Sequence, residues 1–219
     1  MNPAESLTRS IAKSSSSKEL VVTLSDVGID QFIDSGVLRD IPIVGSIVGL
    51  VKAGNEIQAF LFARKVLAFL AETEKVPLAT RAEFVAKHCD TKANSEHVGE
   101  VLLSYLSNID HVKQAQILGR IFARFMLGEI SRGSYDWHSA VARSLNPYLI
   151  AQIEMYYGSA NGYRVDAPAV MQLANLFLLE VDYAQADPRM KYSNIPLRRS
   201  PRGTNFGSHF FDHYLKGLE

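Results

Sequence analysis

Two histidines near the C-terminus have a spacing that lets two side chains share one metal ion. His209 and His213 lie four residues apart, with Asp212 between them, in an amphipathic stretch. Imidazoles one helical turn apart can ligate the same zinc ion. However, no glutamate completes an HExxH pattern, and no third ligand is evident nearby in the sequence. We therefore predict a surface helix here and no metal site.

A second candidate is the tripeptide His88-Cys89-Asp90, whose residue types serve in nucleophilic catalysis. Neighbouring side chains on a helix point apart, so adjacency does not give a Cys–His pair a common direction. We interpret Cys89 as a small core residue instead. P-loop, GxGxxG and GxSxG patterns are also lacking. The sequence thus predicts no catalytic residue, no enzyme, no cofactor and no small-molecule substrate.

Basic residues gather between an apolar helix and the final amphipathic helix, where five positive charges accompany one negative charge: Arg189, Lys191, Arg198, Arg199 and Arg202. The prolines in this stretch and its lack of helical period favour two short strands joined by a loop. Helix, hairpin with a basic tip, then helix is the outline of a winged-helix wing. Such side chains would bind phosphates and add affinity with little sequence preference. The alternative is a solvated loop whose charges offset acidic surface elsewhere.

The elements that must position these residues are helices, because apolar residues recur at spacings of three and four along most of the chain. Proline and Asn, Asp or Ser mark their starts, and Gly128 marks one end. We predict these helices: 19–34, 42–73, 78–90, 95–109, 111–128, 135–145, 147–158, 168–181 and 207–218. The fold class is therefore mainly α, a multi-helix bundle with a small winged-helix-like hairpin near the C-terminus.

Composition fits such a bundle, since 47% of the 219 residues are hydrophobic and 21% are charged. Lys+Arg and Asp+Glu balance at 23 each, so no net field draws the chain to nucleic acid or anionic lipid. Cys89 is the single cysteine, which excludes an internal disulfide framework and favours a reducing cytoplasm. We predict three parts: a disordered Ser-rich tail at 1–18, a bundle at 19–158, and a helix–hairpin–helix module packed on it at 159–219.

Residues 40–70, DIPIVGSIVGLVKAGNEIQAFLFARKVLAFL, contain an uncharged run of eleven residues from Ile41 to Val51. Small and polar residues recur at helical spacing and form one stripe along an otherwise apolar helix: Gly45, Gly49, Lys52, Asn55, Glu56, Ala59 and Ala63. Gly45, Gly49 and Ala53, spaced by four, also form a small-residue ridge. Such a ridge allows close approach of a second helix, in the bundle or in a homo-oligomer. The alternative is a membrane-inserting helix at 41–63, for which Lys52 and Glu56 would each cost ~2.5–3.5 kcal/mol.

Two stretches resemble a family. VGEVLLSYLSNIDHVKQAQILGRIFARFMLGEIS (98–131) is similar to a segment of uncharacterised bacterial proteins of mobile elements and phage-defence regions. The closing LANLFLLEVD and KYSNIPLRRSPRGTNFGSHFFDHYL (173–215) resemble the end of abortive-infection-alpha type proteins. There a leucine-rich helix precedes a hairpin and a T-x-x-G-x-x-F helix entry, which Thr204, Gly207 and Phe210 match here. The resemblance covers about a third of the chain and implies a bacterial or prophage setting and a defence role.

Three functions remain open from the sequence. The first is a non-enzymatic helical protein that acts through a protein partner or by self-assembly, in phage defence or prophage biology. The second is a conditional membrane effector that forms a pore with the 41–63 helix. The third is a nucleic-acid-binding regulator that uses the basic hairpin at 189–202.

Overall fold

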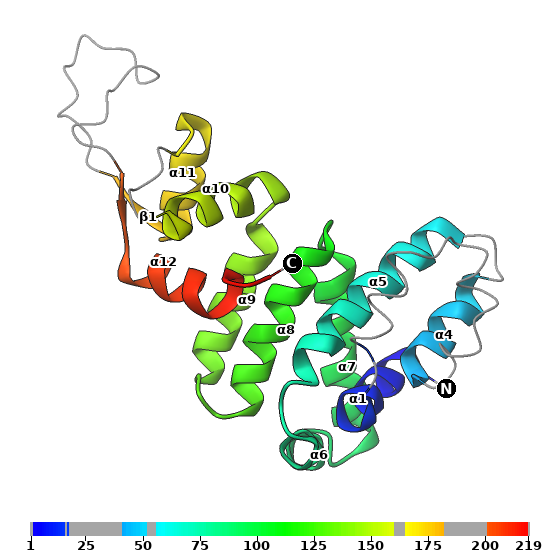
Figure 1. Ribbon diagram of the computed structural model, residues 1–219. Helices are drawn as coiled ribbons and strands as arrows, with labels where there is room; N and C mark the ends of the chain where they lie inside the picture. The colour runs from blue at the N-terminus through cyan, green and yellow to red at the C-terminus, as the bar shows by residue number, and fades with distance from the viewer. Residues whose placement is uncertain are drawn as a thin grey trace, which may run out of the picture. The chain divides into compact units, whose positions relative to one another are not determined.

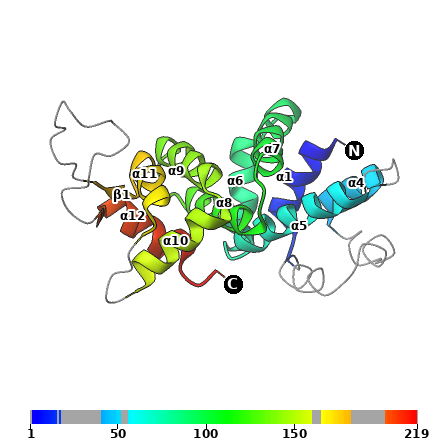
Figure 2. The same cartoon turned by 90° about the horizontal axis from the view of Figure 1, so that it is seen from above.

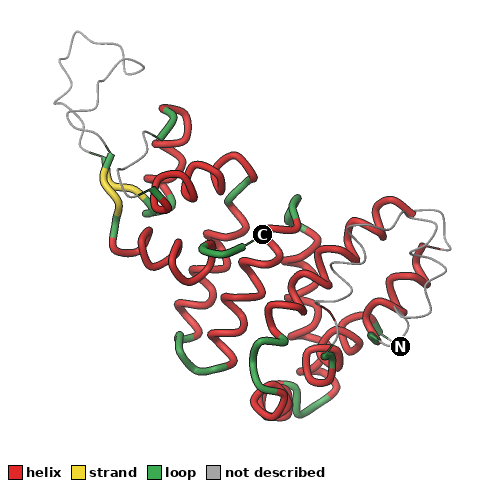
Figure 3. The backbone as a smooth tube through the Cα atoms, in the orientation of Figure 1, coloured by secondary structure: helices red, strands yellow, loops and turns green. Residues whose placement is uncertain are grey.

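The computed structural model describes residues 2–15, 17, 41–51, 56–159, 165–181 and 201–218. Within these ranges the protein is mainly helical with one small antiparallel sheet near the C-terminus, as predicted (Figure 1, Figure 3). The chain separates into two units, Met1–Ser144 and Leu145–Glu219. The sequence placed this boundary after Gly158, which is wrong, because the helix before Gly158 contacts the following helices and belongs with them.

The first unit holds seven helices among its described residues: α1 (Pro3–Lys13), α4 (Pro42–Val51), α5 (Glu56–Thr73), α6 (Leu78–His88), α7 (Lys92–Ser107), α8 (Val112–Met126) and α9 (Arg132–Ser144). Helices α5 and α8 form its centre, where the rings of Phe69 and Phe122 lie 5.6 Å apart. Beside them, Arg120 Nε donates to Glu72 Oε2 at 3.0 Å. Both the core contact and the ion pair fix α8 against α5.

Helix α8 shows how local sequence sets an element of this fold. Its apolar face recurs at helical spacing and is buried, and Ile117 and Ile121 have no exposed surface. His111 caps the start: its Nδ1 accepts from the Lys113 N–H at 3.2 Å, in a capping box with Gln114. The helix predicted over 111–128 is therefore confirmed, and its first residue is Val112.

The prediction of a disordered tail at 1–18 is wrong for residues 3–13, which form α1. Asn2 caps this helix and Pro3 occupies its first turn, both favourable positions. Leu7 and Ile11 are buried in a groove formed with α4, α6 and α7, and Figure 2 shows α1 beside α4 and α7. The serine-rich composition of residues 1–18 favoured a disordered tail, so the short apolar stripe of Leu7 and Ile11 was not recognised as a helix face.

Hydroxyl groups supply the rest of the α1 interface. Ser10 Oγ donates to the Ser6 carbonyl within the helix and accepts the Ile43 N–H of α4 at 3.2 Å. Thr8 Oγ1 and Ser95 Oγ share a hydrogen bond of 2.8 Å between α1 and α7. Buried hydroxyls are tolerated when they are paired in this way. The α1 interface therefore combines a short apolar stripe, Leu7 and Ile11, with paired hydroxyl groups.

The segment predicted as one helix over 42–73 has the correct ends but consists of two helices. Helix α4 ends at Val51 and α5 begins at Glu56, and the two lie side by side (Figure 1). The predicted single stripe is consequently divided: Gly45 is exposed on α4, whereas Ala63 on α5 is fully buried. The membrane-inserting helix predicted at 41–63 thus falls into α4 and α5 in this structure, and its insertion into a bilayer stays a prediction. Among the described residues, no helix is both long enough and apolar enough to cross a bilayer.

The described part of the second unit contains α10 (Pro147–Gly158), α11 (Ala167–Asn175), β1 (Leu179–Glu180), β2 (Arg202–Gly203), α12 (Asn205–Phe210) and a π-helical segment η3 (Phe211–Leu215). Strands β1 and β2 pair antiparallel, with Leu179 opposite Gly203 and Glu180 opposite Arg202. Its core includes Leu173, Phe210 and Tyr214, each at most 1% exposed. The helix predicted at 19–34 lies outside the described residues.

We expect Gly128→Ala to lower the free energy of unfolding of the first unit by about 1 kcal/mol, because Gly128 has a φ of 73°. It ends α8 in a Schellman motif, in which the N–H of Glu129 donates to the Arg124 carbonyl at 3.0 Å. An added Cβ would meet no atom within 4 Å. The cost is therefore conformational, and urea unfolding followed by the fluorescence of Trp137 measures it.

Gly45→Ala is the matched control for this variant. Its Cβ also meets no atom within 4 Å, but Gly45 lies within helix α4. Alanine there should raise stability by about 0.5–1 kcal/mol. A loss of stability in both variants would contradict the conformational explanation. A loss for Gly45→Ala that depends on protein concentration would instead support the small-residue ridge as an oligomer contact.

Candidate functional site

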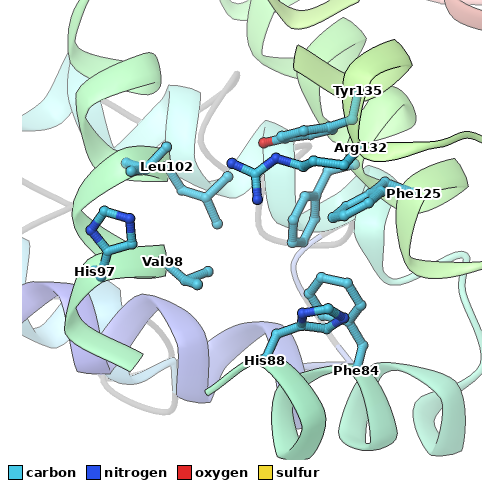
Figure 4. Close-up of a pocket in the computed structure, with 10 residues that line it drawn as sticks. Phe84, His88, His97, Val98, Leu102, Phe125, Arg132 and Tyr135 are labelled. Atoms are coloured by element: carbon cyan, nitrogen blue, oxygen red, sulfur yellow. The ribbon is translucent and has the colours of Figure 1, made fainter. Parts of the chain in front are cut away.

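Helices α6, α7, α8 and α9 enclose a cleft of about 60 Å³ within the first unit (Figure 4). Most of the lining side chains are aromatic or aliphatic, and three others carry nitrogen groups: Phe84, His88, His97, Val98, Val101, Leu102, Phe122, Phe125, Arg132 and Tyr135. A space of this size holds roughly four waters. The cleft can therefore receive the end of one side chain or a small organic group.

Helical spacing brings these side chains to one place. Helix α6 contributes Phe84 and His88, four residues apart, whose ring centroids lie 4.4 Å from each other. Helix α9 contributes Arg132 and Tyr135, three residues apart, with the guanidinium carbon 5.8 Å from the tyrosine ring centre. Residues three or four apart share a helix face. Helices α6 and α9 thus each present two side chains toward the cleft, and α7 presents four.

Ring contacts hold the aromatic part of the cleft in a fixed geometry. Phe84 meets the rings of Phe122 and Phe125 edge to face, with both centroid distances at 5.5 Å. Phe125 also stacks on Tyr135 at 4.8 Å with an angle of 23° between the ring planes. Each such pair contributes ~0.5–1.5 kcal/mol beyond its buried area. The apolar floor is therefore formed before any ligand arrives.

Nitrogen groups surround the opening of the cleft. His88 and His97 are exposed, and within the described chain neither imidazole makes a hydrogen bond or an ion pair. Arg132 Nε donates to both carboxylate oxygens of Asp136 at 3.0 and 3.1 Å, and both side chains are exposed. Figure 4 shows His88, His97 and Arg132 around the same space. Among the described residues that line the cleft, none is acidic.

Burial raises the pKa of Tyr135 well above its ordinary value, because the phenolate would lose its hydration inside the aromatic cluster. The phenol therefore stays neutral over the physiological pH range. With an apolar floor, a neutral phenol and basic groups at the rim, the cleft suits an apolar group joined to an anion. Nothing in this geometry supplies a nucleophile next to a general base.

Cys89 lies just beyond the cleft, at the end of α6, and is half-buried. Burial raises the pKa of its thiol, and the neighbouring charge of Asp90 raises it further. A reactive cysteine needs the opposite shift, because the thiolate is the nucleophile. The described residues also contain no group of three His, Cys, Asp or Glu side chains arranged to hold a metal ion.

Few of the residues predicted as a nucleic-acid or helix-packing site fall where their side chains are described. Arg202 is exposed on β2 and Gly45 is exposed on α4. Gly49 lies in α4 and Glu56 begins α5. The other predicted residues lie outside the described ranges: Arg189, Lys191, Arg198, Arg199, Lys52 and Ala53. The structure thus does not gather a basic surface from the residues it describes.

The T-x-x-G-x-x-F motif is a helix entry, as the resemblance implies. Thr204 caps α12: its Oγ1 accepts the Gly207 N–H at 2.8 Å and donates to the Phe177 carbonyl at 2.6 Å. Phe210 is fully buried. The Tyr157 hydroxyl donates to the Leu178 carbonyl and accepts the Thr204 N–H. The motif therefore secures the start of α12 against Phe177 and Leu178, which directly precede β1.

Sequence reasoning missed the cleft itself. Of the residues that line it, the sequence singled out only His88 as a candidate functional residue, as part of the tripeptide His88-Cys89-Asp90. The available signal was the repeated pairing of an aromatic residue with His or Arg at helical spacing, in Phe84 with His88 and Tyr135 with Arg132. That pattern places two residues on one face but does not say which helix faces it. Comparison of the chain with protein-family models, curated proteins and solved structures gave no match.

Proposed function

We propose that this chain is a non-enzymatic helical interaction protein that binds a partner protein at the α6–α9 cleft. The partner would insert one apolar side chain next to a carboxylate. The observation that carries this proposal is the preformed aromatic floor beneath a rim of His88, His97 and Arg132, without an acidic side chain among the described lining. Apolar anchors in fitted pockets dominate the energy of many protein interfaces.

The size of the cleft favours a side chain over a free metabolite. Pockets that enclose drug-sized ligands measure ~300–1,000 Å³, several times the 60 Å³ observed. A leucine, valine or phenylalanine tip would fill this volume, while the rest of its chain stayed on the surface. The anchor alone would bind weakly, so the partner must make further contacts around the rim.

Charge favours an anion beside that anchor. Arg132 and Asp136 are both exposed, so their ion pair contributes little, on the order of 0–1 kcal/mol, and Arg132 can exchange partners. A carboxylate on the partner would accept from the arginine fork and from an imidazole N–H. Following the resemblance to abortive-infection-alpha proteins, we place this contact in the cytoplasm of a bacterial cell, in phage defence or prophage biology.

A matched pair of small probes tests the cleft. We expect 4-methylpentanoate to perturb the NMR signals of the cleft residues in the full chain at millimolar concentration, more strongly than the neutral 4-methylpentan-1-ol. Val98→Phe should abolish binding by filling the cleft. Val85→Phe is the control, because Val85 lies on the same helix as Phe84 but does not line the cleft.

Arg132→Gln separates the two parts of the proposal. It should remove the preference for the acid over the alcohol, an effect of about tenfold in Kd or 1.4 kcal/mol, while the apolar group still binds. Signal changes outside the cleft, or an unchanged titration for Val98→Phe, would contradict the proposed function.

A further inference from the structure

The two C-terminal histidines lie together on a helix whose hydrogen-bond pattern changes between them. The imidazole centroids of His209, in α12, and His213, in η3, are 4.3 Å apart with 50° between the ring planes. From Phe211 the helix is π-helical, and the Lys216 N–H donates to the Phe211 carbonyl at 2.9 Å. Short π-helical turns are rare and are frequently found at functional sites.

The opposite face of this helix is fixed by the core of the second unit. Phe210 and Tyr214 are fully buried, and their rings meet edge to face at 5.1 Å. His209 is half-buried and His213 is exposed. The packed face therefore holds the helix while the histidines remain within reach of solvent. A site on such a rigid element is better preorganised than one on a loop.

We propose that His209 and His213 form a two-imidazole site for a divalent transition metal of the zinc, nickel and copper class. Imidazole nitrogens bind zinc at ~2.0–2.1 Å. The two rings lie close enough that rotation about their side-chain bonds can aim a nitrogen of each at one ion. Water, or a ligand from a partner protein, would complete the coordination.

The neighbourhood sets the strength and selectivity of this site. Asp212 pairs with Lys216 at 3.6 Å, on the same helix, and the described residues gather no third protein ligand. The affinity should therefore be that of a two-ligand site, weaker than a four-ligand structural zinc site. It should follow the Irving–Williams order, with copper bound more tightly than nickel or zinc.

The test is a titration of the metal-free full chain with Cu²⁺, Ni²⁺ and Zn²⁺ by calorimetry. We expect one ion per chain, and an electron paramagnetic resonance spectrum of the copper form with coupling to two nitrogens. His209→Gln and His213→Gln should each weaken binding at least tenfold and remove the two-nitrogen signal. Asp212→Asn is the control, as it changes an exposed neighbour on the same helix and leaves both imidazoles in place.

Circular dichroism of each variant shows whether the fold persists. Because His213 is exposed, His213→Gln keeps the test valid even where His209→Gln disturbs the helix. Binding that survives in both single variants would overturn the proposal. So would the absence of binding at about 1 mM metal, which would leave the rings as a simple packing contact.

Discussion

Arg81→Met should lower the free energy of unfolding of the first unit by about 3 kcal/mol. This loss is larger than the loss of about 1 kcal/mol that we expect for Gly128→Ala in the same unit. Arg81 is 3% exposed, and its guanidinium donates to three backbone carbonyls of the described chain. Nη1 donates to Ile11 at 2.8 Å and to Ser14 at 2.9 Å, and Nε donates to Val76 at 3.1 Å. One side chain thus joins the end of α1 to the loop between α5 and α6.

Removing this side chain leaves three buried acceptors without a donor. The carbonyls of Ile11 and Ser14 belong to the last turn of α1 and its cap, which have no partners inside the helix. A cation at the C-terminus of α1 also interacts favourably with the negative end of the helix dipole. Burial lowers the pKa of Arg81 and the charge of Glu74 partly offsets this, so the guanidinium stays protonated. Methionine restores the packing and none of these bonds.

The single tryptophan, Trp137, lies in α9 of the first unit, so its fluorescence follows urea unfolding there. Arg81→Lys is the matched control, since it keeps the charge but not the planar fork, and it should recover about half of the loss. Faster amide exchange over residues 3–13 in the methionine variant would locate the damage in α1. A loss below about 0.5 kcal/mol, with unchanged exchange, would show that water satisfies these carbonyls.

Helices with a complete local signal were predictable from the sequence. The start of α10 at Asn146-Pro147 and the end of α8 at Gly128 follow from side-chain capping and a left-handed glycine. The presence of a two-stranded sheet was also predicted, but β1 (Leu179–Glu180) lies within the helix predicted over 168–181, because α11 ends at Asn175. The helix start and the helix end depend on residues within one or two helical turns, so a single sequence contains what is needed to predict them.

Features that depend on distant partners were not predictable. No residue near α1 in the sequence indicates that Arg81, far along the chain, will donate to its last carbonyls. The division of 42–73 into α4 and α5 also needed tertiary information, because both halves have helical periodicity and favourable composition. Likewise, the cleft needs four helices to meet, and periodicity within each one cannot reveal which faces do so. Local pattern thus predicted the elements, while long-range contacts determine the candidate site.

Gly207→Ala should lower the free energy of unfolding of the second unit by about 3 kcal/mol, because the space for a Cβ is already occupied. The Tyr157 hydroxyl oxygen and the Leu178 carbonyl oxygen both lie much closer to that position than van der Waals contact allows. Neither atom can withdraw freely, since the hydroxyl donates to that carbonyl and accepts the Thr204 N–H at 3.2 Å. The added methyl must therefore move α12 away from β1.

Two controls separate this clash from other effects. Gly158→Ala adds the same atom 3.5 Å from the Phe211 ring, an ordinary contact, and should cost little. Tyr157→Phe removes the hydroxyl and its hydrogen bonds, at about 1–2 kcal/mol.

In the double variant Gly207→Ala with Tyr157→Phe, the methyl group meets no hydroxyl, so the combined loss should be at least 1 kcal/mol smaller than the sum of the single losses. The loss of unfolding free energy in each single variant and in the double variant is measured by urea unfolding, with amide exchange of residues 205–215 as the probe. Additive losses would show that the methyl group does not compete with the Tyr157 hydroxyl, and that the Leu178 carbonyl and the Tyr157 ring carbon Cζ, 2.7 Å from the added Cβ, exclude it. A Gly207→Ala protein as stable as the parent would instead refute the close approach. The spacing of Thr204, Gly207 and Phe210 would then be explained by the Thr204 cap and the buried Phe210 ring alone, because the substitution changes neither.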